Sequence, residues 1–366
     1  MAAKKGFRIK SLLPPLIVIG ALGWLSTLEV ELPDVFVQEQ IIELRDRFYD
    51  VVVPNEQVVW AVGKSGKIVR SDDRGETFYV QSTPTEAHLQ SIAAWDDQHA
   101  VVIGNDGLTL NTVDGGVTWE PVDAPLGEVA KKMFRTEIGP NGRVWATAEF
   151  GSILYSDDRG LSWTRVGGDQ DVAWNDVGFA KPDQVCVDEK IEQPSCSDDE
   201  NRAGCAGDEV EQRSCSDGPV DRVCVVGEFG QLGCSDDQGE TWLAKETPLD
   251  SSLMGIAFSD DLNGLAVGLD GHVLQTADAG ETWAAVNSPT GKHLFGLDWV
   301  DGVWVIVGEK GTFLQFDPIK STWIEENLGS KGNVWYTGVQ SGHGGIYISG
   351  QALGIWKDGE LHQFGR

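Results

Sequence analysis

The chain has 366 residues and a net charge of −29 at pH 7, from 57 acidic and 28 basic side chains. A surface this acidic repels phosphate backbones, which excludes nucleic acid as an expected partner. Hydrophobic residues make up 41% of the chain, enough for a sizeable core, while the 45 glycines and 14 tryptophans are unusually many. Both of these excesses are periodic along the sequence.

Residues 1–28 have the composition of a targeting segment. Residues 1–10 contain four basic residues and no acidic one, and the run from Ser11 to Leu28 is uncharged. As a helix, such a run would span about 27 Å, close to the hydrocarbon thickness of a bilayer. Basic residues before the run and acidic residues after it orient the N-terminus to the cytoplasm. We therefore predict a single-pass inner-membrane anchor with the remaining chain in the periplasm; a removable signal peptide is the alternative.

An internal repeat decides the fold class. The pattern Ser/Thr-x-Asp-x-Gly-x-Thr/Ser-aromatic occurs at 71–78, 112–119, 156–163, 235–242 and 276–283, with a degenerate copy at 316–323. A glycine-bounded turn between two apolar runs lies before each copy, and a seventh such turn follows the last copy. The second glycines of these turns are at 66, 107, 151, 230, 271, 311 and 354. One interval is 79 residues and the others are 40 to 44. A unit of about 41 residues with four short β runs is the size of a propeller blade.

We therefore predict an all-β fold, a seven-bladed β-propeller of four-stranded blades over residues 47–366, preceded by the transmembrane helix. In the first repeat the strands are expected at Tyr49–Pro54, Val58–Gly63, Lys67–Ser71 and Thr77–Gln81. The second glycine of each turn is expected to adopt positive φ. A solenoid is the alternative architecture. Residues 29–46 are either a linker with a short helix capped by Asp34 or an outer strand that closes the ring.

The Asp-containing octapeptide is expected to stabilise the fold and to have no catalytic role. Its hydroxyl and carboxylate groups accept hydrogen bonds from the backbone of a tight turn, its glycine takes a restricted conformation, and its aromatic residue covers the turn. The residues assigned to this structural role are Ser71, Asp73, Gly75, Asp114, Trp119, Asp158, Trp163, Asp237, Trp242, Asp278 and Trp283.

These octapeptides resemble Asp boxes, also called BNR repeats. Together with the glycine turns, in an arrangement such as WAVG-x-x-G followed by S-x-D-x-G-x-T-aromatic, they make residues 47–366 similar to the photosystem II stability/assembly-factor propellers and their relatives in non-photosynthetic bacteria. The resemblance implies a seven-bladed, non-enzymatic propeller that assists the assembly of a membrane-protein complex. Relatives outside photosynthesis imply an RND-type exporter or a similar transporter as the partner.

All six cysteines lie between Cys186 and Cys234, which agrees with an oxidising compartment. Their spacings alternate between 10 and 9 residues, and the surrounding residues repeat as well, so an insertion at 185–222 looks like two extra copies of a hairpin in the fourth blade. We predict three disulfides, one within each copy: Cys186–Cys196, Cys205–Cys215 and Cys224–Cys234. The spacing does not suit a zinc site. Calcium binding by the acidic insertion is the other alternative.

The sequence has no zinc-protease, nucleophile-elbow or phosphate-loop motif, and we expect no enzymatic activity, cofactor or metal. The alternative is a sialidase-like or xyloglucanase-like hydrolase, which would need a pair of carboxylates in a pocket. Basic and aromatic residues recur where the first strand of each blade begins, and such residues favour a protein interface. The predicted partner-binding residues are Arg47, Phe48, Lys131, Lys132, Arg135, Trp174, Lys292, His293, Trp335 and Tyr336.

Overall fold

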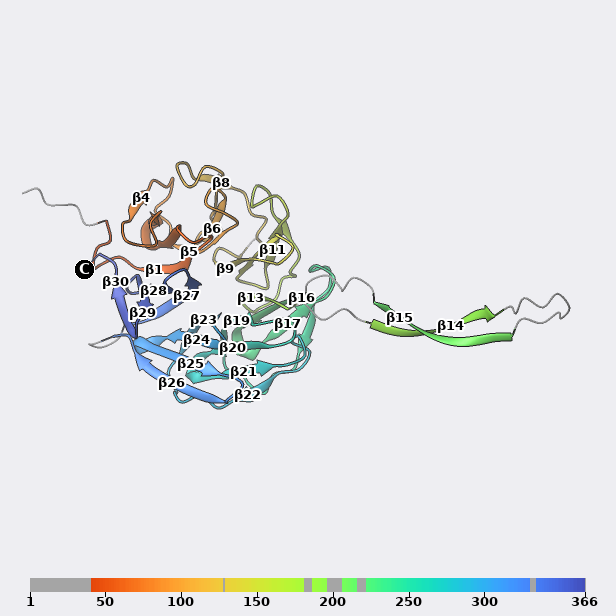
Figure 1. Cartoon of the computed structure of the whole chain (residues 1–366). Coiled ribbons are helices and arrows are strands. Elements are labelled where there is room, and N and C mark those ends of the chain that lie inside the picture. Colours follow the sequence, from red (N-terminus) through yellow and green to blue (C-terminus); the bar gives the residue numbers. More distant parts are fainter. Residues whose placement is uncertain are drawn as a thin grey trace, which may run out of the picture. The chain divides into compact units, whose positions relative to one another are not determined.

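The computed structural model describes residues 41–127, 129–180, 186–195, 206–215, 222–329 and 334–365, with the backbone path alone for 186–195 and 206–215. These residues form seven four-stranded antiparallel sheets and one two-stranded sheet. The first strand of each four-stranded sheet contacts the first strand of the next, and the last of them, β27, contacts β1 (Figure 1). The predicted seven-bladed propeller is therefore confirmed.

Each blade is a simple meander, in which the chain runs from the inner strand outward. Blade one contains β1 (Phe48–Val52), β2 (Val59–Gly63), β3 (Ile68–Ser71) and β4 (Tyr79–Gln81), and blade two contains β5 (Leu89–Ala94), β6 (Ala100–Gly104), β7 (Thr109–Thr112) and β8 (Glu120–Val122). Blade three contains β9 (Met133–Ile138), β10 (Val144–Ala148), β11 (Ile153–Ser156) and β12 (Thr164–Arg165). Blade four contains β13 (Trp174–Ala180), β16 (Arg222–Gly227), β17 (Leu232–Ser235) and β18 (Leu243–Lys245).

Blades five to seven contain β19 (Leu253–Phe258), β20 (Gly264–Gly268), β21 (Val273–Thr276), β22 (Ala284–Val286); β23 (Leu294–Val300), β24 (Val303–Gly308), β25 (Thr312–Asp317), β26 (Thr322–Asn327); and β27 (Tyr336–Gly342), β28 (Gly345–Gly350), β29 (Gly354–Lys357), β30 (Glu360–Gln363). Four short 3-10 turns join second and third strands: η2 (Lys64–Gly66), η3 (Glu228–Gly230), η4 (Leu269–Gly271) and η5 (Glu309–Gly311). The strands predicted for the first repeat are all present, with ends displaced by at most two residues.

In every blade, the turn after the second strand is held against the start of the inner strand. The first turn residue donates its N–H to the carbonyl oxygen of the residue just before the inner strand, as Lys64 does to Arg47 at 2.9 Å. A Cβ atom on Gly63 would clash with that same carbonyl, which explains the first glycine of the turn. The second glycine has positive φ in blades one to six, as predicted. The prediction is wrong for Gly354, which lies in β29 without a positive φ.

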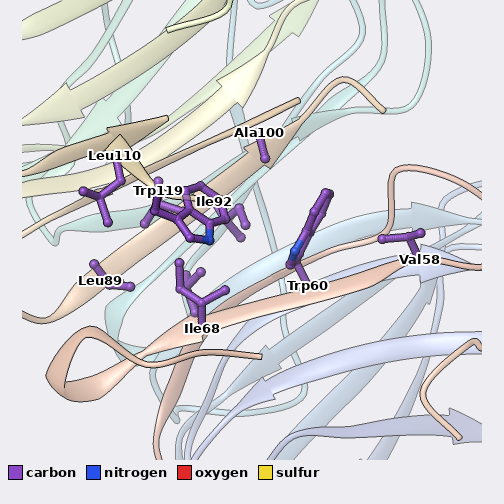
Figure 2. Close-up of a cluster of buried hydrophobic side chains, with 10 residues drawn as sticks. Val58, Trp60, Ile68, Leu89, Ile92, Ala100, Leu110 and Trp119 are labelled. Atoms are coloured by element: carbon purple, nitrogen blue, oxygen red, sulfur yellow. The ribbon is translucent and has the colours of Figure 1, made fainter. Parts of the chain in front are cut away.

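The hydrophobic core is divided into clusters that lie between neighbouring blades. In the cluster between blades one and two, Trp60 of β2 and Trp119 of the second Asp box gather with Ile68, Leu89 and other apolar side chains (Figure 2). Both indole nitrogens donate to Oε1 of the buried Gln81, each at 3.1 Å. The tryptophans therefore bury apolar area without leaving their N–H groups unpaired.

The five Asp boxes have the same internal hydrogen bonds. In the first box, Ser71 Oγ donates to Asp73 Oδ1 at 2.7 Å and accepts from the Gly75 N–H at 2.7 Å. Asp73 in turn accepts from the backbone N–H of Thr77 at 2.8 Å and from its hydroxyl. The other four boxes repeat these bonds at 112–118, 156–162, 235–241 and 276–282. Each box thus joins the third and fourth strands of its blade by the predicted turn.

The boxes also seal the seam to the preceding blade. The carbonyl of the fourth box residue accepts a side-chain hydrogen bond from that blade in every copy, and the fifth residue, a glycine with positive φ, packs against it. The donor and acceptor pairs are Tyr347 to Arg74, Arg70 to Gly115, Asn111 to Arg159, Arg143 to Gln238, and Arg222 to Ala279, at 2.5–3.2 Å. A motif that closes a local turn therefore also connects neighbours around the ring.

Blade seven closes the ring with strands from the C-terminal part of the chain alone. Its four strands are β27 to β30, and Thr337 donates to the carbonyl of Tyr49 in β1 at 2.8 Å. Residues 41–46 form no strand; Ile42 packs with Leu353 and Phe364 beside the junction of blades one and seven. The expected ring-closing outer strand is therefore absent from the described part of 29–46. Residues 29–40, and the helix predicted for 1–28, lie outside the described residues.

Among the described residues, no helix is long and hydrophobic enough to pass through a bilayer.

The insertion in blade four differs from the expected pair of hairpins. The third cysteine copy is a hairpin as predicted: Cys224 and Cys234 are opposite each other in β16 and β17 and form a disulfide. The first two copies instead form one ladder between β14 (Cys186–Ser195) and β15 (Ala206–Cys215). Residues 186–195 and 206–215 therefore each contribute one strand to a shared ladder, where two separate hairpins were expected. This ladder disfavours the predicted pairings Cys186–Cys196 and Cys205–Cys215, in which Cys196 and Cys205 lie outside the described residues.

The box hydroxyl provides a test of the stabilising role. Ser71 is fully buried, and Ser71→Ala would leave a buried N–H without an acceptor. We expect the free energy of unfolding to fall by about 1–3 kcal/mol in urea denaturation. Ser321→Ala, at an exposed position of the degenerate sixth copy, is the control and should change it by less than about 0.5 kcal/mol. Equal stability of the two variants would contradict the role assigned to the box.

The ladder register provides a test of the disulfides. Cys186 is directly opposite Cys215. Peptide mapping without reductant should recover the Cys224–Cys234 link and a second link that joins the Cys186 and Cys215 peptides. Recovery of a Cys186–Cys196 link would show that the ladder does not form.

Candidate functional site

All seven inner strands begin with the same local distortion. The first residue is a buried apolar side chain, the next is a β-bulge residue that is half-buried, and regular pairing resumes at the third. The seven bulge residues are Tyr49, Gln90, Phe134, Asn175, Met254, Phe295 and Thr337. Bulges commonly redirect side chains beside functional sites. The inner strands all begin at one end of the channel, and there the bulge residues form a partly apolar lining.

The third residue of each inner strand is polar or charged in one half of the ring and glycine in the other half. Blades one to four carry Asp50, Ser91, Arg135 and Asp176 there, whereas blades five to seven carry Gly255, Gly296 and Gly338. A cavity of about 210 Å³ lies in the channel, lined by the charged residues Arg135, Glu137, Asp176 and Asp298 and by apolar residues that include Met254 and Phe295.

Arg135 is the centre of the charged half. Its guanidinium contacts Asp50 at 3.0 Å, Glu137 at 2.7 Å and Asp176 at 3.4 Å. Burial lowers its pKa, but the three carboxylates raise it by more, so that the group stays charged. Removing Arg135 would leave several buried carboxylates without a counter-charge, which is the costly case for buried ions.

The carboxylates around Arg135 are held by backbone N–H groups as well. Asp50 accepts from Val51 and Ile92, and Asp176 accepts from Val177 and Ile256. Further along the channel, Asp298 accepts from Trp299 and Ser341. These aspartates therefore link adjacent inner strands, and their oxygen atoms are already occupied by donors of the protein.

Burial shifts three of these carboxyl groups towards neutrality, including Asp298, whose pKa it raises. It raises the pKa of Glu137 to about 7, although Arg135 opposes the shift. It also raises the pKa of Asp176 to about 6 against the same guanidinium and the Ile256 N–H. The Glu137 side chain is 38% exposed and lines the channel cavity, whose walls limit its hydration. Such shifts are frequent at functional sites and also occur in structural ion-pair networks.

The predicted partner-binding residues separate into three groups. Phe48, Trp174 and Tyr336 are buried between blades and belong to the core, and Arg135 lies in the channel. The remaining six lie around the starts of the inner strands and are half-buried or exposed: Arg47, Lys131, Lys132, Lys292, His293 and Trp335. Phe48, Trp174 and Tyr336 are the first residues of their inner strands, whereas Arg135 is the third residue of its strand. Residue type alone does not reveal these positions, which decide burial.

Contacts fix several of these six residues. Trp335 stacks on Tyr49 with ring centroids 6.0 Å apart. Lys132 places its ammonium 4.9 Å from the Phe134 ring centroid. His293 accepts from the backbone N–H of Asp270 in the preceding blade at 3.0 Å. These contacts position aromatic and basic groups on one face, on which the seven turns also lie.

Sequence reasoning missed the bulge residues Tyr49, Phe134, Met254 and Phe295. Each directly follows the buried first residue of an inner strand, so alignment of the repeats by that residue would have found them. Among the described residues, no cluster of His, Cys, Asp and Glu side chains is suited to a metal ion.

The propeller is similar to known proteins in sequence and in fold. Residues 79–175 match the family described as "Photosynthesis system II assembly factor YCF48". No curated protein matches the sequence. Among solved structures, "YCF48 bound to D1 peptide" is 14% identical with a TM-score of 0.61, covering 87% of this chain and 92% of that one. "YCF48 from Cyanidioschyzon merolae" is 15% identical with a TM-score of 0.60, covering 88% and 96%.

The WD40 β-propeller domain of Doa1 is 10% identical with a TM-score of 0.61, covering 85% of this chain and 92% of that one. The predicted resemblance to the photosystem II assembly-factor propellers is therefore confirmed. The structural similarities show the fold, which the WD40 domain shares with the same TM-score as the first YCF48 structure.

The raised pKa of Glu137 predicts a pH-dependent contribution to stability. Its folded value of about 7 lies above the ordinary 4.5, so the fold prefers the protonated group, and this contribution is lost as the pH rises through 7. Glu137→Gln keeps the side chain neutral. The melting temperature of Glu137→Gln minus that of the native protein should therefore rise as the pH is raised from 5 to 8.

Differential scanning fluorimetry at several pH values measures this difference. Glu120→Gln, on the exposed strand β8, is the control and should show a constant difference. A constant difference for Glu137→Gln as well would contradict the shift.

Proposed function

We propose that this protein is a non-enzymatic assembly or accessory factor for a membrane-protein complex of the cell envelope. In this proposal residues 1–28 anchor the chain in the inner membrane, and the propeller lies in the periplasm. The propeller binds an extended segment of its partner on the face where the inner strands begin. An RND-type exporter is the partner class that we favour.

The observation that carries this proposal is the composition of that face. It exposes part of the Tyr49–Trp335 stack, Phe134 and Phe295, with basic side chains beside them in a strongly acidic chain. Aromatic residues next to cationic ones are the usual anchors of protein interfaces. A propeller holds them rigidly, so little conformational entropy is lost when a partner binds.

The compared proteins support the same class of function. One solved relative is a YCF48 propeller bound to a D1 peptide, that is, a propeller of this shape in complex with a peptide. In our proposal this chain likewise holds a peptide segment, from a different membrane protein. The match to the YCF48 family over residues 79–175 includes Lys131, Lys132, Phe134 and the start of blade four.

A glycoside hydrolase is the second candidate. Glu137, with its pKa of about 7, faces a channel cavity and has the protonation that a general acid needs. Against this, Arg135 contacts Glu137 and the nearby carboxylates, while backbone N–H groups occupy Asp50 and Asp176. The Asp-box carboxylates are bound within their own turns.

Co-purification from solubilised membranes tests the proposal. The full-length chain with a C-terminal tag should retain a defined envelope membrane protein, identified by mass spectrometry. Replacing both stacked rings, Tyr49→Ser with Trp335→Ser, should reduce its recovery at least tenfold because the aromatic anchor is lost. Leu161→Ser, at an exposed apolar position within an Asp box, should leave recovery unchanged.

Unchanged recovery with the double variant would remove this face from consideration. Turnover of aryl glycosides by the native chain, lost on Glu137→Gln, would instead favour the hydrolase.

The periplasmic location is tested with a cysteine introduced at the exposed position Ile319. A membrane-impermeant reagent should label this cysteine in intact spheroplasts.

A further inference from the structure

Two phenylalanines occupy turn positions that disfavour them. Phe150 and Phe229 are the central residues of the turns between the second and third strands of blades three and four, with φ of 54° and 56°. The left-handed region is costly for a bulky side chain, whereas Asn, Asp and Gly tolerate it. The equivalent residues of blades one, two, five and six are polar, namely Ser65, Asp106, Asp270 and Lys310.

Burial does not offset this conformational cost. The Phe229 side chain is 64% exposed and that of Phe150 is 38% exposed, and neither belongs to a core cluster of the described residues. Strained, exposed aromatic residues on neighbouring blades are the kind of feature that binding sites retain.

The two turns border one segment, residues 170–173. The carbonyl of Phe150 accepts from the N–H of Gln170, and Gly151 donates to Val172. On the other side, Glu228 donates to the carbonyl of Ala173 and its carboxylate accepts from the Ala173 N–H. The two phenylalanines therefore flank the start of the inner strand of blade four.

Basic side chains adjoin the same turns. Glu149, just before Phe150, donates its N–H to the Lys132 carbonyl, and its carboxylate accepts from the N–H groups of Lys131 and Lys132. No described acidic residue forms an ion pair with either lysine. Glu149 and Glu228 have their carboxylates engaged by backbone N–H groups, while exposed Val129 and half-buried Phe134 add apolar area.

We propose that the surface formed by Lys131, Lys132, Phe134, Phe150 and Phe229, here called the blade three–four surface, is the docking site for an extended acidic and apolar peptide segment. The phenylalanines would hold apolar side chains, and the lysines would pair with carboxylates, since no residue in the described part of this chain of net charge −29 forms an ion pair with them. A lipid surface is disfavoured, because anionic headgroups repel so acidic a protein. This inference rests on the proposed function and identifies where the partner segment docks and what chemistry it has.

The test uses the full-length chain in detergent micelles and an immobilised library of random 12-residue peptides. Bound peptides should be enriched in Asp, Glu and large apolar residues. The affinity of the strongest binder, measured by fluorescence anisotropy, should fall at least tenfold for Phe150→Asn with Phe229→Asn. It should also fall at least tenfold for Lys131→Glu with Lys132→Glu.

Two further measurements separate docking from structure. Asn tolerates positive φ, so the double Phe variant should melt at or above the native temperature; a clear fall in melting temperature would make the phenylalanines structural and overturn the inference. Leu243→Asn, exposed on β18 of blade four, is the control and should retain binding.

The outcomes distinguish this inference from the proposed function. Enrichment of basic peptides, no enrichment at all, or unchanged affinity of the double Phe variant would overturn the docking site. If the peptide is instead lost on Tyr49→Ser with Trp335→Ser alone, the proposed function stands and this footprint fails. Phe-dependent binding to vesicles containing 30% phosphatidylglycerol would replace the peptide by a membrane and overturn the inference.

Discussion

The seam between neighbouring blades depends on one recurring interaction, in which an Asp-box carbonyl accepts a side-chain hydrogen bond from the preceding blade. The carbonyl points outward because the box hydroxyl and carboxylate bind the N–H groups inside the turn. The box glycine lets the two blades approach, since at Gly239 a Cβ would lie 2.8 Å from Trp145. Local turn chemistry thus sets the spacing of whole sheets.

Blade seven shows what the seam is like without a box. Its outer hairpin turns at Asp358 and Gly359, and open grooves lie along its junction with blade six, both lined in part by Trp356. The junction of blades seven and one has the seam bond of the first box, from Tyr347 to the Arg74 carbonyl, together with the Thr337–Tyr49 hydrogen bond and the packing of Ile42 and Phe364. Ring closure therefore combines the recurring seam bond with apolar packing.

The interior and the surrounding face have different electrostatic characters. In the channel, Arg135 and its carboxylates form a network whose charges are mutually satisfied, which suits the joining of inner strands. On the face where these strands begin, lysines and aromatic rings are less engaged with the protein itself. A partner segment meets less competition from internal bonds at that face than in the channel.

The sequence by itself determined the number of blades, the four strands of each and the structural role of the boxes, because these depend on spacing and on contacts within eight residues. It also identified the Cys224–Cys234 hairpin from the repeated spacing of the cysteines. The tertiary structure decided which residues near the strand starts are exposed: the bulge buries Phe48, Trp174 and Tyr336 and presents Tyr49, Phe134 and Phe295. It also brought Arg135 to Asp50 and Asp176 from three different blades. Register and ring closure bring together residues far apart in the chain, and the local pattern contains no signal for such contacts.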